Sequence, residues 1–176
     1  MDALAAFSLP IAGLRMGEHP FEFPLDGSFF REFPDSPVRE ATVRAKVLVE
    51  KHPAMYVLRF DLLGSVRTDC DRCLEPFDLP IDVEERLTLK FGTGESEDDD
   101  VEYITRDASH YNVAHHLYEF TVLDIPVNKT HDDADQSCDP DMLARLEQLS
   151  RPTASDDGDA PDETIWDALK KNLTDN

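Results

Sequence analysis

The stretch from Phe77 to Phe91 constrains the fold most, because its side chains alternate almost without interruption. Every even position from Asp78 to Lys90 is charged, threonine or proline. Only Glu85 breaks the apolar stripe, which consists of Phe77, Leu79, Ile81, Val83, Leu87, Leu89 and Phe91. This pattern predicts a long strand with one dry and one wet face, as in an antiparallel sheet.

Other segments in the first half have the same period. Alternation over residues 43–49 and again over 56–62, joined by Lys51-His52-Pro53-Ala54, predicts a hairpin. Residues 21–25 predict an edge strand, because Pro24 cannot donate to a ladder, and residues 101–104 predict a short strand. The first ninety residues show no alternation of strand and helix, which argues against a parallel doubly wound sheet.

Helical patterns appear only in the second half. Residues 112–124 predict a helix with Asn112 as cap, although a buried strand near its end is an alternative. Asp139-Pro140 predicts the start of a second helix and Asp162 the start of a third. We therefore expect an α+β fold: an antiparallel β-sheet or partly open barrel from the first ~105 residues, followed by two or three helices.

The domain organisation follows from these patterns. We expect a single α+β domain over residues 1–150, with an acidic loop at 92–100 and a Cys/His loop at 126–138. Residues 151–161 predict a flexible acidic linker, and residues 162–176 a short amphipathic helix. That helix either packs on its own domain or anchors a partner, with Trp166, Leu169 and Lys170 as candidate partner-binding residues.

The charge of the chain limits its partners. The sequence holds 38 acidic and 17 basic residues, a formal net charge of −21, and residues 92–176 carry 22 of the acids and 6 of the bases. Such a chain is not expected to dock directly on nucleic acid or on an anionic membrane. A macromolecular partner of the second half should be basic.

The expected compartment is the cytoplasm. No apolar run approaches the roughly 18 residues of a spanning helix, and the N-terminus lacks a basic signal-peptide region. Three cysteines do not make a secreted disulfide framework.

Four residues form a candidate metal site. Cys70 and Cys73 make a C-x-x-C between two strands, and a later loop contributes His131 and Cys138. Together they predict a closed Cys3His site for one structural zinc ion. The alternative is that the cysteines are reduced interior residues without a ligand. A redox dithiol is disfavoured because the C-x-x-C leads into a strand, and catalytic zinc because four protein ligands leave no open position.

No other constellation in the sequence indicates an active site. Phosphate-binding, dinucleotide-binding, zinc-protease and serine-hydrolase signatures are absent. His115 and His116 are adjacent and point to different faces of a helix, so we interpret them as surface or core histidines.

Several of these segments, in this order, resemble the YceD family of bacterial large ribosomal RNA subunit accumulation proteins. The resemblance covers nearly the whole chain and is carried by the Phe29-Phe30 turn, Thr68-Asp69-Cys70-Asp71-Arg72-Cys73-Leu74-Glu75, Tyr118-Glu119-Phe120 leading into Ile125-Pro126, and Trp166-Asp167-Ala168-Leu169-Lys170-Lys171. It implies a cytoplasmic, non-enzymatic factor for the accumulation or processing of large-subunit (23S) rRNA.

Charge and resemblance together lead to one principal hypothesis and two alternatives. The principal one is a ribosome-biogenesis factor that binds a basic ribosomal protein or a pre-ribosomal particle. The alternatives are a zinc-dependent hydrolase or nuclease acting on precursor rRNA, and an acidic nucleic-acid mimic.

Overall fold

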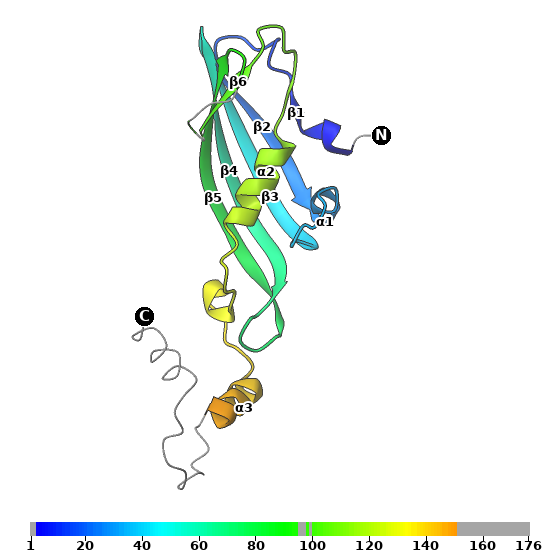
Figure 1. Cartoon of the computed structure of the whole chain (residues 1–176), viewed down its shortest axis with the longest axis vertical. Helices are drawn as coiled ribbons and strands as arrows, with labels where there is room; N and C mark the ends of the chain where they lie inside the picture. The colour runs from blue at the N-terminus through cyan, green and yellow to red at the C-terminus, as the bar shows by residue number, and fades with distance from the viewer. Residues whose placement is uncertain (1–2, 95–97, 99, 151–176) are drawn as a thin grey trace, which may run out of the picture. The chain divides into compact units, whose positions relative to one another are not determined.

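A five-stranded sheet forms the body of the protein in the computed structural model, which describes residues 3–94, 98 and 100–150. Its strands lie in the order β2 (Gly17–Asp26), β3 (Glu40–Lys51), β4 (Met55–Asp69), β5 (Pro76–Phe91) and β6 (Val101–Ile104) (Figure 1). Strands β1 (Ser8–Leu9) and β7 (Tyr111–Asn112) form a separate antiparallel pair. The predicted α+β class is confirmed. The large sheet stays open, since its outer strands β2 and β6 do not pair with each other among the described residues.

The strands predicted from alternation are present. β3 and β4 form the expected antiparallel hairpin, whose turn is closed by the His52 amide donating to the Met55 carbonyl at 2.9 Å. β5 pairs with β4 along its whole length without a bulge. β2 is an edge strand, as Pro24 predicted, and a second proline, Pro20, lies at the same parity in it.

β6 differs from the expected antiparallel arrangement. It pairs with β5 in the parallel direction, with Thr88 opposite Val101 and Phe91 opposite Ile104. Because Thr88 lies opposite Val101, β6 begins three residues back along β5 rather than at its end.

The main predicted helices are also present. α2 (Ala114–Leu123) begins two residues later than expected, because Asn112 belongs to β7 and its Oδ1 accepts a hydrogen bond from the Ala114 amide at 2.8 Å. The alternative of a strand near the end of this segment is wrong. α3 (Pro140–Ser150) follows Asp139, as predicted.

Three further short helical elements were not predicted: η1 (Ala3–Phe7), α1 (Gly27–Phe30) and η2 (His131–Ala134). For α1 the sequence held a usable signal, since the Asp26 carboxylate accepts hydrogen bonds from the amides of Ser28 at 2.8 Å and Phe29 at 3.2 Å.

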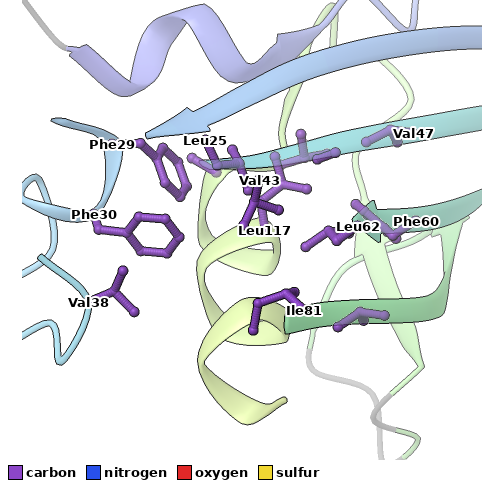
Figure 2. Close-up of a cluster of buried hydrophobic side chains, with 14 of the residues drawn as sticks. Leu25, Phe29, Phe30, Val38, Val43, Val47, Phe60, Leu62, Ile81 and Leu117 are labelled. Carbon is purple, nitrogen blue, oxygen red and sulfur yellow. The ribbon is translucent and has the colours of Figure 1, made fainter. Parts of the chain in front are cut away.

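The core lies between one face of the sheet and α2. The odd-numbered apolar residues of β5 from Phe77 to Leu89 are buried together with side chains from β2, β3 and β4, and Phe91 is half-buried. Leu117 of α2 points into this layer and is fully buried (Figure 2). Figure 2 shows Phe29 and Phe30 of α1 completing the cluster beside Leu25 and Val38. Because only the sheet face that packs against α2 is buried, apolar and polar residues alternate along each strand, and this alternation allowed the strands to be predicted.

The chain divides into two compact units, Met1–Leu143 and Ala144–Asn176, and the boundary falls within α3. The predicted linker at 151–161 and helix at 162–176, with Trp166, Leu169 and Lys170, lie outside the described residues. Among the described helices, none has the length and apolar character needed to cross a membrane.

Candidate metal centre

The turn between β4 and β5 presents Cys70 and Cys73 on its inner side. The Leu74 amide donates to the Cys70 carbonyl at 2.8 Å, and the Cys70 amide donates to the Glu75 carbonyl at 3.0 Å. These bonds fold residues 70–75 into a tight knuckle in which both thiols are buried, whereas Leu74 is 71% exposed. The knuckle therefore holds both thiols on the same, buried side of the turn.

A second segment brings His131 and Cys138 to the same point. The Asp71 amide donates to the Lys129 carbonyl at 2.7 Å, and the Lys129 amide donates to the Asp71 carboxylate at 2.6 Å. η2 then begins with a capping box formed by Thr130 and Asp133, which orients His131 toward the knuckle. Both His131 and Cys138 are buried.

The four donor atoms lie within 4.8 Å of one another. The Sγ atoms of Cys70 and Cys138 are 3.7 Å apart, and Cys73 Sγ lies 3.4 Å from His131 Nδ1. A tetrahedral zinc ion with bonds of about 2.3 Å to sulfur and about 2.0 Å to nitrogen requires separations of about 3.8 Å and about 3.5 Å. These two separations match the required values, so the arrangement could hold a metal ion, and its ligand types are ones that zinc takes.

Electrostatics around the cluster favour the thiolate of Cys70 and oppose that of Cys138. Burial raises the pKa of Cys70, but hydrogen bonds from the backbone of Cys73, Arg72 and His131 and from the His131 side chain outweigh it and lower that pKa to about 6. Burial and the neighbouring Cys70 and Cys73 raise the pKa of Cys138. Without a cation, three thiols in one buried pocket resist ionising together, whereas a divalent ion removes this conflict.

Arg72 is a supporting residue that the sequence analysis did not single out. Its Nη1 lies 3.9 Å from Cys138 Sγ, and its Nη2 donates to the Asp132 carboxylate at 2.8 Å. With Zn²⁺ bound, three thiolates and a neutral histidine would carry a net negative charge, which the Arg72 guanidinium would compensate. The available signal was its position inside the C-x-x-C motif.

The two adjacent histidines do not join the cluster. His115 is exposed and pairs with Glu119 at 3.1 Å. His116 is half-buried, with its Nε2 2.6 Å from the Tyr111 hydroxyl and 3.2 Å from a Glu102 carboxylate oxygen. Their interpretation as surface and core histidines agrees with these contacts.

His116 makes the stability of the fold dependent on pH. Burial lowers its pKa and outweighs the opposite effects of Glu102 and Glu119, while His115 lowers it further. The unfolded chain therefore binds the proton more readily, and stability is lost as the pH falls below the unfolded value of about 6.5. We expect His116→Gln to reduce the loss of unfolding free energy between about pH 7.5 and about pH 5.5. Urea titrations at several pH values measure this, with His110→Gln, at an exposed histidine, as the matched control. Equal slopes for His116→Gln and the unmodified protein would contradict it.

The fold and the cluster define a small α+β protein in which three cysteines and a histidine lie close together and could hold a metal ion. Residues 58–171 match the family model described as large ribosomal RNA subunit accumulation protein YceD, and the matched range is more than half of the chain. The chain belongs to the YceD family. Searches of curated proteins and of solved structures found no match. The family is described by a role in the accumulation of large-subunit rRNA and is not named as an enzyme family.

Proposed function

We propose that this protein is a non-enzymatic factor in the biogenesis of the large ribosomal subunit, and that it acts in the cytoplasm by binding a basic ribosomal protein. Family membership supports the role in accumulation or processing of 23S rRNA. The observation that carries the choice of partner is the formal net charge of −21. RNA would be repelled by this charge, whereas small basic proteins would be attracted.

The proposed cofactor is one structural zinc ion held by Cys70, Cys73, His131 and Cys138. The zinc ion would hold the knuckle at residues 70–75 against the segment that links α2 to α3. Between residues 125 and 139 only His131 and Cys138 are buried among the described side chains, so the segment has little apolar packing of its own. Binding of a metal by both sides would replace that missing packing.

A basic partner would gain from the acidic protein in two ways. Opposite charge accelerates encounter, and a bound acidic surface shields the basic protein from other polyanions until rRNA is available. On this view rRNA accumulation depends on the protein through the ribosomal protein that it delivers or protects.

The test is capture of ribosomal proteins at two salt concentrations. We expect the immobilised full chain to retain at least one basic protein from a mixture of large-subunit proteins freed of rRNA at about 0.1 M salt, and much less at about 0.5 M. Mass spectrometry identifies the retained protein. In a parallel assay with 23S rRNA added to this mixture, retention of the rRNA without any basic protein would contradict the proposal. So would cleavage of precursor rRNA by the purified zinc-loaded protein, which would favour a hydrolase instead.

A further inference from the structure

Among the described residues, the outer side of β5 has no neighbouring strand over most of its length. Among the described residues, β6 pairs with β5 only from Thr88 to Phe91, which leaves residues 76–87 without a strand on that side (Figure 1). The Thr88 amide donates to the Asp100 carbonyl at 2.8 Å on the side of β6. The β4–β5 register has no bulge, so the other even-numbered residues of β5 point their backbone groups to the same side.

One of these backbone groups already donates a hydrogen bond to a side chain, in the place where a neighbouring strand would accept it. The Asp82 amide donates to a carboxylate oxygen of Asp124, the C-cap residue of α2, at 3.2 Å. In the described part of the chain no strand pairs with the backbone groups of Glu84 and Arg86 on this edge. Unpaired donors and acceptors in a row form a template for an added strand. We call residues 76–87 on this side the open edge.

A small hollow of about 290 Å³ lies where the open edge meets the end of α2. Its apolar lining includes Phe120 and Leu123, and Leu123 is 79% exposed. Glu85 also lines it, which accounts for the single interruption of the apolar stripe in β5, because here the inner face of the strand opens to solvent. We call this the acidic hollow; its lining is Asp82, Val83, Glu84, Glu85, Phe120, Leu123 and Asp124.

The charge of the acidic hollow selects a cationic occupant. It is lined by four carboxylates and no basic side chain. None of the four forms an ion pair with a described residue. Nucleic acid and a second copy of this acidic edge would both be repelled, whereas lysine and arginine side chains would be attracted.

We propose that the open edge and the acidic hollow bind an extended, lysine- or arginine-rich segment of a partner protein, which adds to β5 as a further strand. Backbone hydrogen bonds to Glu84 and Arg86 hold the segment, and an apolar side chain of the partner packs against Phe120 and Leu123. The carboxylates pair with its basic side chains. The inference rests on the proposed function for the class of partner, and adds the surface and the mode of binding.

The decisive variant is Glu84→Pro, because proline removes an amide that faces the open edge and leaves the β4 ladder intact. Glu22→Pro is the matched control: it lies on the opposite edge strand at the parity at which Pro20 and Pro24 already occur. We expect Glu84→Pro to reduce capture of the basic ribosomal protein at least about tenfold, and Glu22→Pro to leave it within about twofold. Leu123→Asn, at an exposed position, is expected to weaken capture at least about fivefold.

Hydrogen exchange reports the added strand directly. In the complex, the amides of Glu84 and Arg86 should exchange at least about tenfold more slowly, while that of Glu22 should not change. If Glu84→Pro fails to fold, Leu123→Asn and the exchange measurement decide. Capture of a basic protein that is unaffected by Glu84→Pro and Leu123→Asn would overturn this inference alone. If the unmodified protein captures no basic protein, the proposed function is wrong and the inference falls with it.

Discussion

Replacing Cys73 by serine is expected to abolish stoichiometric zinc binding and to lower the free energy of unfolding by at least about 3 kcal/mol. Structural zinc sites contribute about 10–16 kcal/mol of binding free energy in small zinc modules, and loss of one thiolate forfeits most of it. Only part of that binding free energy is expected to appear as a loss of unfolding free energy here, because the sheet is also stabilised by its own apolar core. Metal analysis of protein purified without chelator and urea unfolding monitored by circular dichroism measure the two effects.

A second test of zinc binding replaces His131 by asparagine, with His110→Asn as its matched control. His131 is buried at the cluster, whereas His110 is exposed and contacts the Ser109 hydroxyl. We expect only His131→Asn to lose zinc. Backbone exchange at Gln136, whose amide donates to the His131 carbonyl at 2.8 Å, should accelerate with it. A protein that contains no metal, or that unfolds at the same urea concentration with Cys73→Ser, would show that the cysteines are ordinary interior residues.

Gly64→Ala is expected to destabilise the sheet by about 3 kcal/mol, the upper end of the usual cost of overpacking. Gly64 lies in β4 between Val43 of β3 and Ile81 of β5. A Cβ atom there would overlap the Thr42 carbonyl oxygen and lie 2.6 Å from Val43 Cα. Both are backbone atoms of a paired strand, so neither can move aside as the end of a flexible side chain could.

Gly13→Ala is the matched control for Gly64→Ala, because a Cβ atom at Gly13 meets no atom within 4 Å. We expect its unfolding free energy to change by less than about 0.5 kcal/mol. Urea unfolding of the zinc-loaded proteins compares the two variants through their midpoints at an unchanged slope. A Gly64→Ala midpoint equal to that of Gly13→Ala would show that β3 and β4 separate enough at this position to accept the methyl group.

The strands of the sheet could be predicted because their signal is local. β3, β4 and β5 each bury one face, and a buried face requires alternation along the strand itself. The direction of β6 could not be predicted, since four residues carry no information about whether the preceding loop returns to Thr88 or runs on. η1 and η2 were missed because single turns are too short to show helical periodicity.

The candidate metal centre could likewise be predicted in part: its residues from the sequence, but not how they come together. The sequence alone nominated Cys70, Cys73, His131 and Cys138, because two closely spaced thiols and a later Cys/His loop are chemically distinctive. Only the tertiary structure placed Cys138 beside Cys70 across a separation of 68 residues, through the hydrogen bonds between Asp71 and Lys129. It alone also left the outer edge of β5 open beside four carboxylates. Residue types and local periodicity can be taken directly from the sequence. Contacts between segments that are distant in the sequence depend on how the whole chain packs.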